Sequence, residues 1–394
     1  MTDNEKHIPA GYKPSPLGII PEDWEVKRLG EVCTFLDNQR IPIKDADRGK
    51  MKGKYPYYGA SGIIDYVNDY IFDDDLILLG EDGANIITRS TPLAFLVSGK
   101  VWINNHAHVL KANKGYNRYY ICNYLESLSY DKYNTGTAQP KLNQEVCEKI
   151  PVLLPCEKEQ NNISDLLSLW DTAIAKQAAL IEKLTVRKRG LMQQLLTGKK
   201  RLKGFEGEWK RIKAGEIFKS ISVKGNGSEV LLSATQEHGV IPRDQLEGRV
   251  TMPTGDTNSF KLVEVGDFVI SLRSFQGGLE YSEHRGIVSP AYTVLKPIVE
   301  IDKPFYRYYF KSVEFIGHLA IAVIGIRDGK QISYEDFCFV KIPYPNIEEQ
   351  KIISSILMQA DKEIELAKQK LSSLQEQKKG LMQVLLTGKK RIKE

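Results

Sequence analysis

Two histidines one residue apart are the first candidates for chemistry in this sequence. His106 and His108 stand in the segment Asn105-His106-Ala107-His108, and alternate residues of a strand point to the same side. Paired imidazoles of this kind can start a metal site. No cysteine or nearby carboxylate obviously completes the set. We therefore interpret both histidines as structural and expect no metal site.

A second short segment could belong to an enzyme. Ser289-Pro290-Ala291-Tyr292 faintly echoes the (Asp/Asn)-Pro-Pro-(Tyr/Phe) motif of amino-methyltransferases, but it lacks the acid or amide and the second proline. The chain also has no GxxxxGK[ST] loop, no GxGxxG loop and no HExxH pair. We therefore interpret residues 289–292 as a turn before a strand, and expect neither a catalytic site nor a cofactor in this chain.

Polar, glycine-rich loops carry residue types that can read base edges. Asn and Gln can make two hydrogen bonds to adenine, and Arg or Lys can do the same for guanine. Such loops are also common between strands, so the pattern alone leaves an ordinary loop open. The candidate DNA contacts of the first half are Tyr58, Ser61, Asn85, Asn105, Thr137, Gln139 and Lys141. Those of the second half are Thr235, Gln236, Arg273, Ser274, Gln276, Arg327, Lys330 and Gln331.

The elements that carry these loops belong to an internal duplication. Residues 190–202 read GLMQQLLTGKKRL, and residues 380–392 read GLMQVLLTGKKRI. Two shorter segments also recur: Trp24, Gly30 and Glu31 as Trp209, Gly215 and Glu216, and Arg118-Tyr119-Tyr120 as Arg307-Tyr308-Tyr309. The sequence between these anchors diverges almost completely. This predicts a constant frame that presents two different domains.

The frame is predicted to consist of two long helices. Upstream of each repeated segment, apolar residues step by four and three, which is typical of a coiled-coil seam. The seam, which we also expect to dock partners, comprises Ile163, Leu167, Trp170, Ile174, Ile181, Leu184, Leu191 and Leu195 in the first helix. Its counterpart comprises Ile353, Leu357, Ile364, Leu371, Leu374, Leu381 and Leu385. Gly198 and Gly388 suit the left-handed position that ends a helix.

The predicted fold is α+β. Two domains of mixed α/β structure are joined by two long antiparallel coiled-coil helices, which gives a pseudo-twofold internal repeat. Residues 18–31 resemble residues 204–216, so we expect the N-terminal segment to lie where the second helix ends. The predicted divisions are an N-terminal arm (1–16), a first variable domain (17–155), a first helix (156–203), a second variable domain (204–347) and a second helix (348–394).

Composition narrows the class of protein. Of the 394 residues, 42% are hydrophobic and 27% are charged, as in an ordinary globular protein. The net charge of +5 comes from the repeated segments rather than the variable ones. The five cysteines form no CxxC pair, and no stretch of 18 apolar residues exists. We expect a cytoplasmic protein that does not span a membrane.

The whole pattern resembles the specificity (S) subunit of type I restriction–modification enzymes. The resemblance rests on the duplicated GLMQxLLTGKKR segments, on the Trp-x5-Gly-Glu start of each domain and on the Lys-Ile-Pro…Pro…Glu-Gln entry to each helix. These entries run from Lys149 to Gln160 and from Lys341 to Gln350. PYYGASGIIDYVNDYIF, VWINNHAHVL, GDFVISLRS and VSPAY also look like parts of known target-recognition domains.

This resemblance implies a non-catalytic subunit of a larger enzyme. Each variable domain would read one half of a bipartite, asymmetric site in double-stranded DNA. The helices would set the spacing and bind two modification subunits, which carry S-adenosylmethionine and methylate adenine at N6. Restriction subunits would add ATP- and Mg-dependent translocation and cleavage. A self-sufficient methyltransferase or nuclease, and a coiled-coil adaptor with two protein-binding domains, remain the alternatives.

Overall fold

The computed structural model describes residues 8–246, 255–322 and 332–392. It divides into two compact units, which we call unit 1 (Met1–Gln177 with Lys370–Glu394) and unit 2 (Ala178–Gln369). The candidate contacts Arg327, Lys330 and Gln331 lie outside the described residues. Among the described helices, none is long and apolar enough to cross a membrane.

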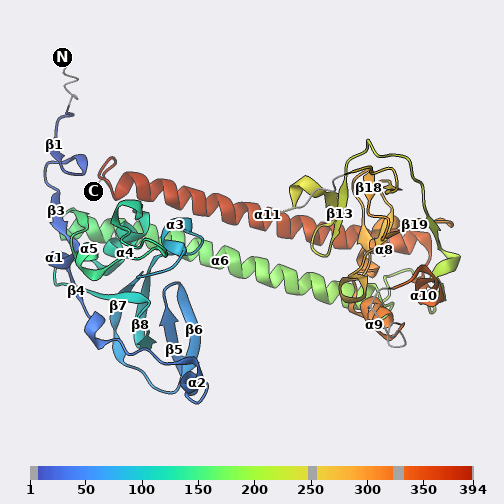
Figure 1. Cartoon of the computed structure of the whole chain (residues 1–394), viewed down its shortest axis with the longest axis horizontal. Coiled ribbons are helices and arrows are strands. Elements are labelled where there is room, and N and C mark those ends of the chain that lie inside the picture. Colours follow the sequence, from blue (N-terminus) through green and yellow to red (C-terminus); the bar gives the residue numbers. More distant parts are fainter. Residues whose placement is uncertain (1–7, 247–254, 323–331, 393–394) are drawn as a thin grey trace. The chain divides into compact units, whose positions relative to one another are not determined.

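Two long helices, α6 (Glu157–Leu195) and α11 (Ile347–Leu385), contribute to both units (Figure 1). Each has 39 residues, which corresponds to a length of about 58 Å. Every residue of the predicted seam is buried or half-buried, whereas most other positions of the two helices are exposed. The predicted coiled-coil stripe is therefore confirmed.

The helices pair antiparallel within each unit. In unit 1, Asp171 of α6 accepts a hydrogen bond from Lys378 of α11 at 2.7 Å. In unit 2, Lys188 of α6 donates to Asp361 of α11. Arg187, one residue earlier in α6, donates to Glu363, two residues later in α11, so the helices run in opposite directions there, as predicted.

Both helices end as their sequences predict. Gly198 and Gly388 have φ angles of 72° and 69°, in the left-handed region that glycine adopts at low cost. Basic residues that follow each glycine then fold back onto the start of the other long helix. Arg391 binds Glu159, and Arg201 binds Glu349.

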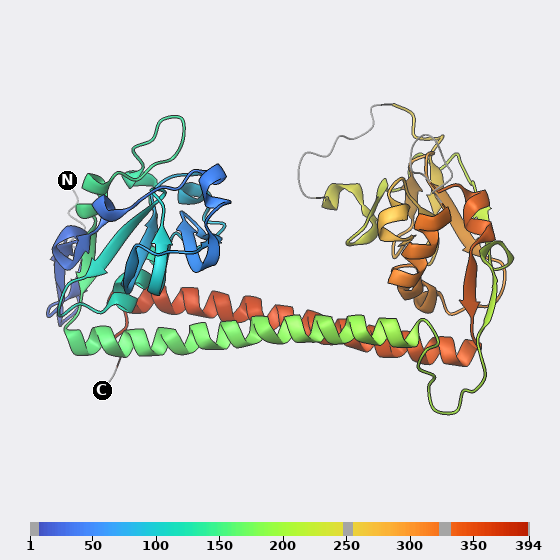
Figure 2. The same cartoon turned by 90° about the horizontal axis from the view of Figure 1, so that it is seen from below.

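Unit 1 contains a six-stranded sheet in the order β4-β9-β7-β8-β5-β6, which Figure 2 shows from a second side. Neighbouring strands in this sheet are antiparallel, except that β5 and β8 are parallel to each other. The strands of this unit are β1 (Tyr12–Ser15), β2 (Gly18–Pro21), β3 (Glu25–Arg28), β4 (Cys33–Phe35), β5 (Lys52–Gly59), β6 (Gly62–Val67), β7 (Phe72–Gly80), β8 (Ala94–Ile103), β9 (Ala107–Ala112) and β10 (Pro151–Leu154). Its shorter helices are α1 (Leu29–Val32), α2 (Asp45–Arg48), α3 (Asn85–Thr88), α4 (Arg118–Ser127) and α5 (Gln144–Glu148).

Unit 2 contains a four-stranded antiparallel sheet in the order β12-β19-β16-β17. The strands of this unit are β11 (Lys210–Lys213), β12 (Phe218–Ile221), β13 (Leu232–Thr235), β14 (Gly239–Pro242), β15 (Lys261–Val263), β16 (Phe268–Ile270), β17 (Glu280–Tyr281), β18 (Gly286–Val288), β19 (Thr293–Pro297) and β20 (Lys341–Tyr344). Its shorter helices are α7 (Ser274–Gly277), α8 (Lys303–Tyr309), α9 (Val313–Ala322) and α10 (Tyr334–Phe339).

The cores of both units extend onto the long helices. In unit 1, Ile163 and Leu167 of α6 and Leu385 of α11 belong to the cluster that contains Trp24 and Tyr120. In unit 2, the equivalent ends of the helices pack with α8 and the strands. The domain and its helix ends are therefore one folded body in each unit.

The repeated Trp-x5-Gly-Glu segment has the same role in both units. Trp24 donates its indole N–H to Glu159, and Trp209 donates to Glu349. A Cβ atom on Gly30 would approach Glu148 to 3.2 Å. A Cβ atom on the repeated glycine, residue 215, would approach residue 338 to 3.0 Å. The repeated tryptophans therefore fasten each domain to the start of a long helix, and the repeated glycines allow a close approach to α5 and α10.

The N-terminal segment lies at the end of the second helix, as the repeat predicts. The Tyr12 hydroxyl donates to the Gly388 carbonyl at 3.0 Å. Asp23 and Glu159 both accept hydrogen bonds from Arg391. The Arg391–Glu159 pair matches the Arg201–Glu349 pair of unit 2.

Candidate nucleic-acid interface

Loops far apart in the sequence meet at one edge of the sheet in unit 1. Asp82, which follows β7, pairs with Lys141 in an isolated antiparallel bridge. The Gly83 N–H donates to the Pro140 carbonyl at 3.1 Å. The ring of His106, which precedes β9, lies 2.8 Å from the Asp82 carboxylate. The edge therefore combines the loops at residues 81–83, 104–106 and 134–142.

Several predicted contacts occupy this edge. Asn105, Thr137 and Gln139 are exposed there. The Lys141 side chain is 48% exposed and lies 3.4 Å from Glu81. Ser61 is exposed in the turn that joins β5 to β6. The end of β5 lies at the same edge, because the Asn104 N–H donates to the Tyr58 carbonyl. These residues are placed where a duplex could reach them.

Two predicted contacts of unit 1 have structural partners instead. The Asn85 amide donates to the Thr91 carbonyl and accepts from the Thr91 N–H, so it closes its own loop. The Tyr58 ring is half-buried beside Phe95, with 6.1 Å between the ring centroids. The Asn85 amide is therefore used by its own loop, whereas the Tyr58 ring is half-exposed.

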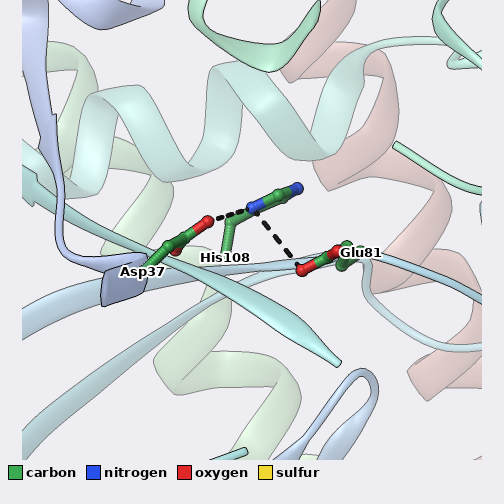
Figure 3. Close-up of side chains that lie close together, drawn as sticks. All are labelled: Asp37, Glu81 and His108. Atoms are coloured by element: carbon green, nitrogen blue, oxygen red, sulfur yellow. Dashed lines mark hydrogen bonds and ion pairs between the residues drawn. The ribbon is translucent and has the colours of Figure 1, made fainter. Parts of the chain in front are cut away.

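A polar cluster that includes Asp37, Glu81 and His108 lies at the base of these loops (Figure 3). His108 Nδ1 lies 2.5 Å from Asp37, and its Nε2 lies 2.8 Å from the Leu142 carbonyl. Arg40 donates to Glu81 at 2.7 Å and lies 3.3 Å from Asp37. Three distant segments and the base of the 134–142 loop are tied together by this one cluster.

The ring of His108 is held as an imidazolium. A carbonyl oxygen only accepts, so Nε2 must carry a proton, and an ionised Asp37 requires a second proton on Nδ1. Burial lowers the pKa of an imidazole, but the Asp37 carboxylate and the Cys147 thiol raise the pKa of His108 overall, to about 10.

The same cluster has the composition of a possible cation site. Ligand atoms of Asp37, Glu81 and His108 lie within 4.8 Å of one another. The Arg40 guanidinium and the imidazolium already balance the two carboxylates, so no further cation is needed to neutralise them. His106 and His108 have different carboxylate partners, and the i, i+2 pair does not converge on one point.

We expect a pH-dependent loss of stability that depends on His108. Its raised pKa stabilises the fold fully below pH 6.5, and this contribution disappears as the pH rises through about 10. The difference in urea-unfolding free energy between wild type and His108→Gln should therefore shrink by about 1.4 kcal/mol per pH unit between pH 7 and 9. His106→Gln, at an exposed imidazole, is the control. If the difference in unfolding free energy between wild type and His108→Gln stays constant with pH, the His108 ring is not an imidazolium.

Unit 2 presents a cavity at its predicted contacts. The cavity has a volume of about 640 Å³, and Thr235, Gln236 and Arg273 line it. Within the described residues, the Arg273 guanidinium has no hydrogen bond or ion pair, and the side chain is exposed. An unpaired guanidinium beside a polar cavity can bind a phosphate or the edge of guanine.

Other residues at this cavity correct or extend the sequence analysis. Ser274 is buried, and its hydroxyl accepts from the Ser271 N–H, so its role is structural. Gln276 is exposed on α7. Tyr292 does belong to a turn before β19, as predicted, but it also lines the cavity together with Gln245. The sequence analysis marked Tyr292 only as part of a turn, and no sequence motif marked Gln245 or Arg40 of unit 1.

The two candidate sites occupy corresponding positions in the two sheets. The order β4-β9-β7-β8 of unit 1 matches β12-β19-β16-β17 of unit 2, with antiparallel neighbours in both. Residues 81–83 follow β7 as residues 271–273 follow β16. Residues 104–106 precede β9 as residues 289–292 precede β19. The same framework therefore presents different side chains in each unit.

A groove also recurs beside the long helices. In unit 2, a groove of about 840 Å³ is lined by Lys188, Arg189 and Met192 of α6, and by the turn after α8. In unit 1, a groove of about 720 Å³ is lined by the repeat-equivalent residues of α11 and by the end of α4. These α11 residues are Lys378, Lys379 and Met382.

The comparisons with known proteins agree with this architecture. The family model described as "Type I restriction modification DNA specificity domain" matches residues 21–186 and 206–376, and the chain belongs to this family. The chain is 27% identical to the type I restriction enzyme MjaVIII specificity subunit of Methanocaldococcus jannaschii, over 95% of this chain and 94% of that protein.

Two solved structures share the fold. The S subunit of the type I restriction–modification system of M. genitalium has a TM-score of 0.56 at 16% identity, over 92% of this chain and 96% of that one. A chain from a study of complex assembly and conformational transition in the type I R-M system has a TM-score of 0.55 at 17% identity, over 94% and 99%.

Proposed function

We propose that this chain is the DNA-specificity subunit of a type I restriction–modification complex. Each unit reads one half of a bipartite, asymmetric site. The observation that carries the proposal is the matching position of the candidate loops in two sheets of the same strand order. Family membership supports a role in DNA specificity.

Base reading is assigned to exposed side chains that make no hydrogen bond or ion pair within the described part of the chain. Asn105 and Gln139 have the amides that can pair with adenine, and Arg273 has the fork that can pair with guanine. The variable segments have little net charge, so many phosphate contacts must come from partners. The two variable domains therefore read the bases, while much of the affinity for DNA comes from the assembled complex.

The recurring groove supports two copies of one partner. In both units the lining contains an exposed basic residue at the repeat-equivalent position, Arg189 or Lys379, and a methionine of the long helix. The groove therefore fits a partner segment that offers an acidic and an apolar side chain. We assign this partner as the modification subunit. S-adenosylmethionine binds to that subunit and not to this chain. ATP and Mg²⁺ belong to restriction subunits that join the same complex.

A reconstitution experiment tests the proposal. The pure chain with S-adenosylmethionine and DNA should transfer no methyl groups, and adding the modification subunit should produce sequence-specific methylation. Methylation by the chain alone would support a self-sufficient enzyme. Failure of the assembled complex to retain any DNA sequence selectively would support the protein-binding adaptor instead.

Charge reversal in one groove tests the stoichiometry. Arg189→Glu and Lys379→Glu each change an exposed residue of a single groove. Each should weaken one of two binding events by about tenfold or more and leave mainly one modification subunit bound, as measured by native mass spectrometry. Lys183→Glu, on α6 outside both grooves, is the matched control. Two copies bound as tightly as in wild type would exclude these grooves.

A further inference from the structure

Unit 1 contains a side-chain triad that joins three helices. Lys378 of α11 donates to both oxygens of Asp171 in α6, at 2.7 and 2.9 Å. The Tyr119 hydroxyl of α4 donates to the same carboxylate. The lysine side chain is only 18% exposed. One carboxylate therefore ties the domain to both long helices.

Unit 2 contains the same triad built from the repeat-equivalent frame residues. Lys188 of α6 donates to Asp361 of α11, and the Tyr308 hydroxyl of α8 donates to Asp361 at 2.7 Å. The Lys188 ammonium also lies 5.3 Å from the centre of the Tyr308 ring. The roles of α6 and α11 are exchanged relative to unit 1, as a pseudo-twofold relation requires.

The lysines occupy the apolar seam itself. Lys188 and Lys378 follow the four-and-three spacing of the seam positions, and both side chains are largely covered. A polar residue at such a position stabilises only the pairing that supplies its partner. Parallel pairing of equivalent positions would place Asp171 against Asp361 and lysine against lysine. Each triad therefore favours the antiparallel register.

The two tyrosines of the triads connect the register of the helices to the position of the domains. Burial and the hydrogen bond to Asp171 raise the pKa of Tyr119, and burial and Asp361 raise the pKa of Tyr308. Both hydroxyls therefore remain hydrogen-bond donors at neutral pH. Since α4 and α8 belong to the domains, the orientation of each domain is linked to the register of the helices beneath it.

We propose that Tyr119–Asp171–Lys378 and Tyr308–Asp361–Lys188 are positioning residues that fix each recognition domain on the helix pair. They thereby sharpen the spacing at which the two half-sites are read. This inference rests on the proposed function for its DNA-dependent part. Its DNA-independent part concerns only the coupling among the three side chains.

The DNA-independent test is a charge exchange measured by thermal unfolding of the full chain. Lys378→Asp and Asp171→Lys each place like charges together and should lower Tm by about 5 °C. The double variant restores an opposite-charge pair and should recover most of that loss. Lys176→Asp, at an exposed position of α6, is the control. Additive losses in the double variant would overturn the proposed coupling, whatever the chain does with DNA.

The DNA-dependent test removes only the hydroxyls. In the reconstituted complex, Tyr119→Phe and Tyr308→Phe should each reduce methylation at the preferred spacer, relative to spacers one base pair shorter or longer, by on the order of fivefold. Tyr124→Phe and Tyr306→Phe are matched controls, because their hydroxyls donate to carbonyls at Pro151 and Pro343. The proposal fails if the triad variants change spacer discrimination no more than these controls.

Discussion

Exchanging residues 17–155 for the corresponding domain of a relative is expected to replace one half of the methylated DNA site and leave the other half unchanged. The exchanged segment contains the whole six-stranded sheet and both strands of the β3–β10 pair, so these two sheets stay intact, and its boundary falls in the turn between β1 and β2. Methylation at the original first half-site should fall at least about a thousandfold, the difference between specific and non-specific binding. Sequencing of methylated bases measures both halves at once.

Point substitutions provide the matched control for this exchange. Arg273→Ala should relax discrimination at one base pair of the second half-site by about 1–3 kcal/mol, because its side chain is exposed and no described residue binds its guanidinium. Ser274→Ala, one residue further on, should lower stability without changing the sequence read, because its hydroxyl bonds the backbone at Ser271. A domain exchange that alters both half-sites together would contradict modular reading.

Lengthening both long helices by one heptad is expected to lengthen the gap between the half-sites. Seven residues inserted after Ala178 and seven after Leu371 keep each seam in phase and add about 10 Å of helix. This corresponds to about 3 bp at ~3.4 Å per step. The half-sites themselves should stay the same. Methylation of DNA substrates whose spacer varies by one base pair at a time measures the shift.

Three-residue insertions at the same two places are the out-of-phase control. They rotate each following segment by roughly 300°, which removes the seam residues from the helix interface. Folding or partner binding should then fail, while the seven-residue variant still assembles. If the in-phase variant assembles and methylates at an unchanged spacer, the helices do not set the spacing.

The frame could be predicted from sequence because its signals are local and repeated. The stepping of apolar residues predicted the seam, and Gly198 and Gly388 marked the helix ends. The resemblance of residues 18–31 to residues 204–216 predicted that the N-terminal segment lies where the second helix ends, which the hydrogen bond from Tyr12 to the Gly388 carbonyl confirms.

The candidate site could be predicted only in part, because its geometry depends on contacts between distant residues. Asn85 and Ser274 have the right chemistry for base contact, but their side chains are used by their own loops. The partners of His108 come from residues 37 and 142, which no spacing rule connects. The matching strand orders could not be predicted from the sequence either, because the two domains form the same strand pairing with different residues.

The most direct test of the central claim is a map of methylated adenines in DNA from cells that express this chain with its modification subunit. The account predicts one bipartite motif, with two different half-sites separated by a fixed gap, that disappears when this chain is omitted. Methylation of the same motif without the chain, or of a continuous motif read by one domain alone, would contradict it.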